Sequence, residues 1–123
     1  MRDYATVCPQ FWTGATGRKL RSLGAEAQLV ALYLMTCPSS TMTGLYYLPL
    51  PTLAHETGIP LEGASKALRR VCEVGFARYD EFTETVWVVQ MAHYQLGETL
   101  SHKDNRHRGV LRELEKQDRK SVV

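Results

Sequence analysis

The sequence lacks the cysteine pattern of a disulfide framework or of a zinc site. Its three cysteines, at positions 8, 37 and 72, are scattered and form no CxxC pair. Disulfide scaffolds carry even numbers of cysteines at short spacings, so this set favours free, buried thiols in a reducing compartment. The four histidines also lack a cysteine or carboxylate at a zinc-like spacing. We therefore expect neither a disulfide nor a metal site.

Long hydrophobic runs and a secretory leader are also missing. No apolar stretch approaches the roughly 20 residues that a bilayer-spanning helix needs, and the N-terminus lacks a basic-then-apolar signal pattern. We therefore expect a cytoplasmic protein without a membrane partner.

Catalytic motifs are absent as well. The sequence contains no Gly-rich phosphate loop, no HExxH, no GxSxG and no recognisable pair of catalytic carboxylates. A lone serine, histidine or cysteine does not make a nucleophile without a partner base. The chain is therefore interpreted as a binding module rather than an enzyme, with no cofactor and no small-molecule substrate.

The length and composition of the chain fit one globular domain, and its charge is unevenly distributed. The chain has 123 residues, of which 44% are hydrophobic and 23% charged, enough for a single core. The net charge is +3 over residues 1–24, −4 over residues 25–100 and +3 over residues 101–123. Both ends are thus basic and the body is acidic. This matters for any nucleic-acid partner, because phosphate contacts supply much of the affinity for DNA.

The most informative stretch predicts two short helices joined by a tight turn. We expect the helices over Pro51–Thr57 and Leu61–Val74. Ala54 is small enough for the helices to cross closely, Gly58 can adopt the left-handed conformation that ends the first helix, and Ile59 can fill the angle between them. This spacing is typical of a helix-turn-helix, which usually binds DNA or a protein partner in DNA transactions.

The flanking segments predict the rest of the fold. Strands are expected at Tyr4–Cys8, Leu45–Leu48, Phe76–Asp80 and Thr85–Gln90, and a buried central helix at Ala25–Met35. Leu32 and Trp87 are expected in the core. The order helix, strand, helix, helix, hairpin is that of a winged helix. The predicted fold class is therefore mostly α with a small β-hairpin (α+β): a winged helix-turn-helix over residues 1–97 and a basic, helical tail over residues 98–123.

Two sets of residues are candidates for DNA contact. On the outer face of the second helix the side chains that suit phosphate oxygens or base edges are Ser65, Lys66, Arg69 and Arg70. In the tail, basic residues recur every four positions and form one stripe on a helix: Arg108, Arg112, Lys116 and Lys120. Both sets are also compatible with a solvated surface, because acidic residues lie among them at helical spacing.

The expected hairpin turn favours a different partner. It reads Asp80-Glu81-Phe82-Thr83-Glu84, three acids around one aromatic residue, and such a turn is repelled by a phosphate backbone. An exposed Phe82 would favour a protein contact, together with any exposed member of the set Tyr46, Tyr47 and Tyr94. A second hypothesis is therefore an oligomerisation or partner-docking module, and a third is a winged-helix transcriptional regulator.

Four blocks carry a resemblance to a known family: FWTGATGRKLRSLGAEAQLVALYLMTCP, TGLYYLPLPTLAHETGIP, ALRRVCEVGFARYDEFTETVWV and KDNRHRGVLRELE. In this order they resemble the N-terminal winged-helix domain of phage and prophage replication-initiation proteins, including the DnaD-like primosomal group. The resemblance implies a DNA-binding role, on duplex or single strands, in the initiation of replication. It also implies self-association or contact with other replication proteins. The chain departs from the family at Pro60, where a serine or aspartate commonly caps the second helix.

Overall fold

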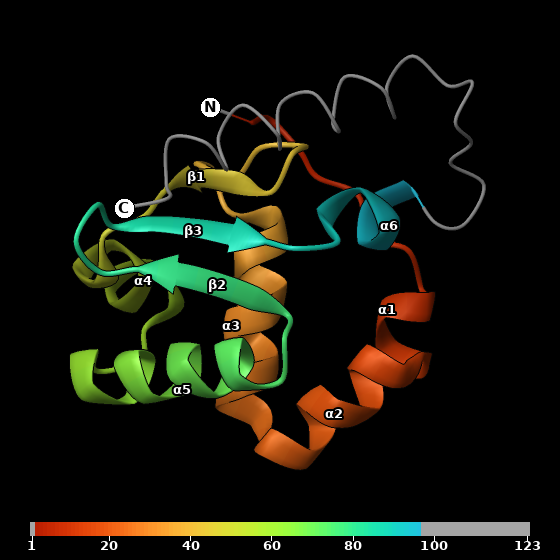
Figure 1. The fold of residues 1–123 in the computed structure, drawn as a ribbon, viewed down its shortest axis with the longest axis horizontal. Helices are drawn as coiled ribbons and strands as arrows, with labels where there is room; N and C mark the ends of the chain where they lie inside the picture. Colours follow the sequence, from red (N-terminus) through yellow and green to blue (C-terminus); the bar gives the residue numbers. More distant parts are fainter. Residues whose placement is uncertain (1, 97–123) are drawn as a thin grey trace.

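The structure is a computed structural model that describes residues 2–96. It contains, in chain order, α1 (Gln10–Thr13), α2 (Ala15–Leu23), α3 (Ala25–Thr36), β1 (Leu45–Tyr47), α4 (Leu50–Thr57), α5 (Leu61–Glu73), β2 (Ala77–Asp80), β3 (Thr85–Val88) and α6 (Met91–Leu96) (Figure 1). This part of the chain is a mixed α+β fold, as the sequence predicted. The expected tail, residues 98–123, lies outside the described residues.

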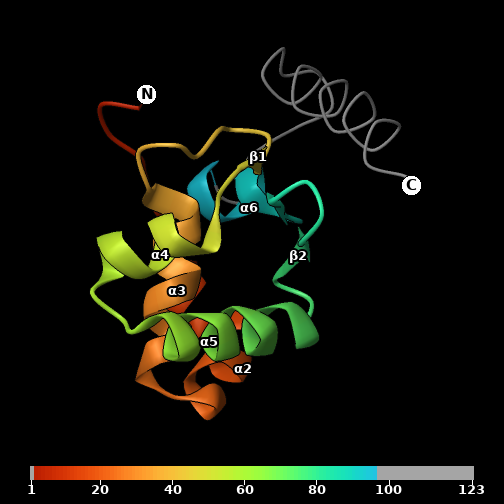
Figure 2. The same ribbon diagram turned by 90° about the vertical axis from the view of Figure 1, so that its left-hand side faces the viewer.

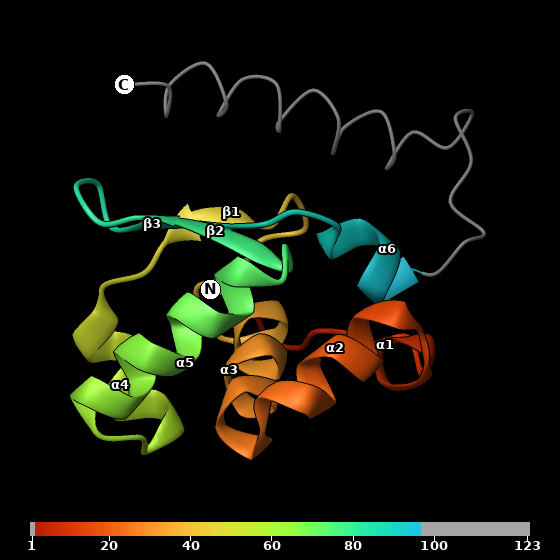
Figure 3. The same ribbon diagram turned by 60° about the horizontal axis from the view of Figure 1, so that its bottom comes forward.

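The three strands form one antiparallel sheet in the order β1-β3-β2. Trp87 of β3 pairs with Leu45 on one side and Arg78 on the other. Alternation along β3 buries Val86 and Val88 completely, because successive side chains of a strand point to opposite faces. That inner face rests on the helical layer formed by α3 and α5 (Figure 3).

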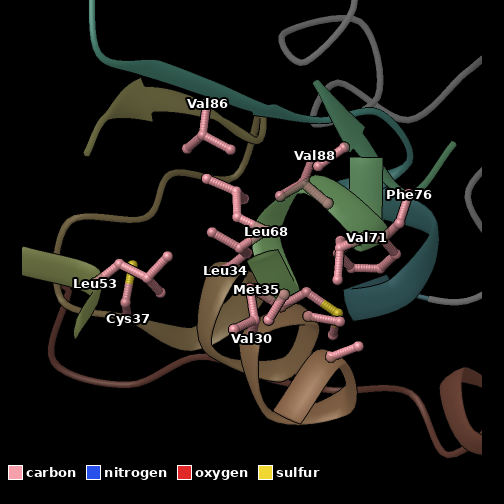
Figure 4. Packing of buried hydrophobic residues seen from close by; sticks show 14 of the residues in the cluster. Val30, Leu34, Met35, Cys37, Leu53, Leu68, Val71, Phe76, Val86 and Val88 are labelled. Atoms are coloured by element: carbon pink, nitrogen blue, oxygen red, sulfur yellow. The ribbon is translucent and has the colours of Figure 1, made fainter. Parts of the chain in front are cut away.

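The core lies where α5 runs across α3 beneath the sheet (Figure 2). Helix α3 contributes Val30 and Leu34, and α5 contributes Leu68 and Val71, all less than 5% exposed. Figure 4 shows these side chains in one cluster with Val86 and Val88 of the sheet. The inner stripe of α5 recurs every three or four residues, so burial of that stripe fixes which face of α5 remains outside.

The connection between α4 and α5 confirms the predicted helix, tight turn and helix. Gly58 has φ +76° and its N–H donates to the Ala54 carbonyl at 3.0 Å, which ends α4 in a left-handed conformation. Ile59 is 6% exposed and fills the angle between the helices. Pro60 stands at the N-cap of α5, and its carbonyl accepts the Ala64 N–H at 2.8 Å. Proline is tolerated there because the first turn of a helix has no internal acceptor for its N–H groups.

The N-terminal segment was predicted wrongly. Residues Tyr4–Cys8 form no strand; instead the Cys8 N–H donates to the Tyr94 carbonyl at 2.6 Å and the Thr6 hydroxyl donates to the Gln95 carbonyl at 3.1 Å. The segment is thus held against α6 rather than against a sheet. The two helices that follow, α1 and α2, were not predicted.

Two residues expected in the core are only half-buried. Leu32 lies on the flank of α3, whose fully buried residues are Val30, Ala31, Leu34 and Met35. Trp87 lies on the outer face of the sheet, because its neighbours along β3 occupy the inner face. The guanidinium of Arg78 lies over the indole ring, 5.5 Å from its centroid. Both corrections have one cause: apolar character alone does not tell which face of an element is turned inward.

Candidate nucleic-acid interface

The outer face of α5 exposes three of the four candidate residues that the sequence placed on this helix. Lys66, Arg69 and Arg70 are exposed, together with Glu62 and Glu73. Lys66 and Arg69 have no hydrogen-bond or ion-pair partner within residues 2–96. The face therefore offers two uncommitted cations one helical turn apart, which suits contact with phosphate oxygens or base edges.

Ser65 is half-buried and lies at the edge of this face, in a groove between α5 and the hairpin. The groove has a volume of about 440 Å³, and its lining includes Arg69 from α5 and Glu81 and Glu84 from the turn between β2 and β3. Its apolar side is formed by Leu50, Leu68, Cys72 and Tyr79. Arg69 thus faces the acidic hairpin turn across a shared groove.

Two titratable groups on the apolar side of this groove, the Cys72 thiol and the Tyr79 hydroxyl, are not poised for chemistry. Burial, followed by the nearby Glu73 carboxylate, raises the pKa of the Cys72 thiol to about 11. Burial, followed by the charges of Glu84 and other neighbours, raises the pKa of Tyr79 to about 12. The Tyr79 hydroxyl donates to the Leu48 carbonyl at 2.8 Å. Both groups therefore stay protonated at neutral pH and act as part of the packing.

The hairpin turn is ordered by one of its own acids. The Asp80 carboxylate accepts the Phe82 N–H at 3.0 Å and the Thr83 hydroxyl at 2.8 Å. This arrangement holds out the Phe82 ring, which is 90% exposed. Of the three tyrosines considered for a protein contact, Tyr47 is 61% exposed, whereas Tyr46 and Tyr94 are buried.

Arg70 faces the opposite flank of α5 and is already engaged. Its Nη1 donates to the Leu23 carbonyl at 3.3 Å, at the last residue of α2. Helix α2 carries three exposed cations, Arg18, Lys19 and Arg21. The sequence did not predict α2, so it could not reveal that the end of this helix contacts α5.

The four candidates from the tail, Arg108, Arg112, Lys116 and Lys120, lie outside the described residues. In the part of the chain that is described, no group of three or more histidines, cysteines or acids is placed to hold a metal ion. None of the helices over residues 2–96 combines the length and apolarity of a membrane span.

A comparison of the chain with protein-family models, with curated proteins and with solved structures found no match. The chemistry of the α5 surface is therefore the basis for a functional proposal.

Proposed function

We propose that residues 25–88 form a winged helix-turn-helix that binds DNA through the exposed face of α5. The element order α3-β1-α4-α5-β2-β3 and the sheet order β1-β3-β2 support this assignment. In such a fold the second helix of the helix pair enters the major groove of the duplex. The proposal therefore assigns α5 to recognition and α4 to its support.

The observation that carries the proposal is the pair of uncommitted cations on α5. Lys66 and Arg69 are exposed, lie on one face and lack partners within residues 2–96. Arginine pairs well with guanine in the major groove, and lysine neutralises phosphate. Ser65 at the edge of the same face can donate to a phosphate oxygen.

The hairpin takes no part in DNA contact in this proposal. Its turn carries Asp80, Glu81 and Glu84 without a compensating cation. Acids in this position are repelled by the phosphate backbone. The duplex then lies along α5 without the phosphate contacts that a basic hairpin would supply.

The role in phage or prophage replication initiation rests on the sequence resemblance described above. A transcriptional regulator of the same fold would use the same surface of α5. A preference for one operator sequence over random duplex would favour regulation, whereas preference for single strands or forked DNA would favour replication.

The test is fluorescence anisotropy of labelled duplex and single-stranded DNA with the full chain across a salt series. We expect Lys66→Ala with Arg69→Ala to weaken duplex binding by about 1–3 kcal/mol for each good contact. Arg78→Ala is the matched control, because Arg78 is an exposed cation on the outer face of the sheet. Unchanged affinity in the double variant, or affinity insensitive to salt, would contradict DNA binding by α5.

A second candidate function is docking to a protein, and one observation favours it. The Phe82 ring is 90% exposed at a turn that Asp80 holds in place. Aromatic residues are enriched at the buried centres of protein interfaces. Light scattering at micromolar concentration would detect self-association, and Phe82→Ser should abolish it. A monomer for both proteins would count against self-association through this turn.

A further inference from the structure

Charge is divided between the two sides of α5. Residues 9–24, which contain α1 and α2, carry three cations and no acid, whereas residues 80–84 of the hairpin turn carry three acids and no cation. The hairpin turn and α2 lie on opposite sides of α5 (Figures 2 and 3). A polyanion that approaches α5 is therefore repelled on the hairpin side and attracted on the α2 side.

Helix α2 is fixed beside α5 by a direct contact. Arg70 of α5 donates through Nη1 to the Leu23 carbonyl at 3.3 Å, at the C-terminal end of α2. Leu20 is 1% exposed and sets the inward face of α2. Lys19 precedes Leu23 by four residues, so the two lie on one flank of the helix.

The cations of α2 differ in what they already bind. Arg21 donates through Nη1 to the Trp12 carbonyl at 2.8 Å and is thus committed to α1. Arg18 and Lys19 are exposed and have no hydrogen-bond or ion-pair partner in the described part of the chain. An anionic partner can therefore bind Arg18 and Lys19 without breaking a hydrogen bond or ion pair within the described part of the chain.

Acids also lie on and beside this surface. Glu62 and Glu73 are exposed on α5, and Glu26 is exposed in the first turn of α3. The Glu26 carboxylate approaches Gly63, where a Cβ on that glycine would meet its Oε2 at 3.5 Å. Gly63 is in the first turn of α5, whereas Arg70 is in the last. Glu26 therefore lies beside the first turn of α5, whereas Arg70 meets the end of α2 from the last turn.

We infer that α2 is a second DNA-contacting element, in which Lys19 and Arg18 bind backbone phosphates of the duplex that α5 reads. The inference rests on the function proposed above and adds to it. Arg70 is a positioning residue: it joins α2 to α5 and keeps its charge at their junction. A major groove about 12 Å wide is bordered by two phosphate backbones, so a helix in the groove benefits from a basic neighbour on one border. In this chain that neighbour is α2 rather than the hairpin.

The test compares four proteins of full length on random duplex DNA across a salt series: wild type, Arg18→Ala with Lys19→Ala, Lys66→Ala, and Arg78→Ala as the control. We expect the α2 double variant to weaken binding equally for all sequences and to lower the slope of log affinity against log salt by about two, one for each lost phosphate contact. Arg78→Ala should match the wild type. Thermal melting of each protein verifies that the substitutions leave the fold intact.

The outcomes separate this inference from the proposed function. If Lys66→Ala weakens binding and the α2 double variant keeps the wild-type slope, the inference is overturned and recognition by α5 stands. An equal loss in the α2 variant and in Arg78→Ala would also overturn it, because the effect would then reflect net charge alone. If the α2 variant lowers the slope and Lys66→Ala binds like the wild type, α2 contacts DNA and the assignment of α5 fails.

Discussion

The Tyr46 hydroxyl donates to the Leu34 carbonyl at 2.6 Å, and this bond ties β1 to α3 inside the core. The same hydroxyl accepts a weak bond from the Cys37 thiol at 3.4 Å. Burial is the main cause that raises the pKa of Tyr46 above its ordinary value, so the hydroxyl remains a donor throughout the neutral range. The strand that precedes the helix pair is therefore anchored by a polar contact as well as by apolar packing.

Tyr46→Phe removes this donor and leaves the buried Leu34 carbonyl without it. We expect a loss of about 1–3 kcal/mol in the free energy of unfolding, measured with urea. The matched control is Tyr47→Phe, because Tyr47 is 61% exposed and its hydroxyl lies at 3.5 Å from the Glu84 carboxylate. The control should change stability by less than about 0.5 kcal/mol. Equal effects of the two substitutions would show that the buried hydrogen bond contributes nothing.

Alanine substitution of two glycines with positive φ should lower the stability of the protein to different extents. Gly58, with φ +76°, has no atom within 4 Å of an added Cβ, so Gly58→Ala meets only the left-handed penalty of about 1–2 kcal/mol. Gly44, with φ +84°, would place its Cβ 2.4 Å from the Val88 carbonyl oxygen. Gly44→Ala must therefore also displace β3, and we expect a clearly larger loss in thermal stability. A similar melting temperature for both variants would contradict this crowding.

The α4–α5 pair could be predicted because its signals are local. Gly58 and Ile59 act within a few residues of the turn that they form. Helices α1 and α2 could not be predicted from the sequence, because Gly14 and Gly17 weaken any helical pattern there. Gly17 is nevertheless helical and buried, and an added Cβ there would lie 2.3 Å from the Trp12 carbonyl oxygen. Gly17 thus weakens the helical pattern of the sequence, but its lack of a Cβ allows α1 to approach α2 closely.

Substitutions on the inner and outer faces of α3 should differ in their effect on stability. Leu34 is fully buried and Leu29 is 43% exposed, although both belong to the same apolar helix. We expect Leu34→Ala to cost about 2–5 kcal/mol of unfolding free energy, and Leu29→Ala much less. Chemical denaturation of the two variants measures the difference. Comparable losses would mean that α3 is rotated about its axis relative to the structure.

This contrast also explains why Leu32 was placed wrongly from the sequence. Apolar residues surround α3 on all sides, so the helical period offers no preferred face. In α5 the charged residues mark the outer face, and Lys66, Arg69 and Arg70 are exposed there as expected. The orientation of α3 is decided by the sheet and by α5, which no local pattern reveals. For the same reason Arg70 was assigned to the interface without its contact to Leu23.

The Cys72 thiol should react slowly with alkylating reagents at neutral pH. Because burial raises its pKa to about 11, the thiolate at neutral pH is roughly 100-fold rarer than for an unperturbed thiol. Alkylation of Cys72 by iodoacetamide, followed by peptide mass spectrometry, should be slow at pH 8 and accelerate as the pH rises towards 11. The same chain in urea serves as the control, since unfolding exposes the thiol. Equal rates in native and unfolded protein would contradict the burial of this side chain.

The hairpin acids should restrain DNA binding rather than support it. Glu81 and Glu84 share a groove with Arg69, one of the two uncommitted cations of α5. Their charges lower the positive potential at Arg69 and repel the phosphates that approach it. We therefore expect Glu81→Gln with Glu84→Gln to tighten duplex binding, most strongly at low salt, where screening is weakest. Asp3→Asn, an exposed acid in the N-terminal segment, is the control and should leave affinity close to that of the wild type.

The direction of this effect discriminates between the two functions proposed for the chain. If the duplex lies on α5, neutralising the nearby acids can only reduce repulsion, and the gain should disappear when Arg69→Ala is added. If the turn instead docks a basic protein surface, the same substitutions should weaken that complex and leave DNA binding unaffected. Because Asp80 orders the turn through Phe82 and Thr83, it is left in place in both experiments. A change in affinity then reports on charge and not on the shape of the hairpin.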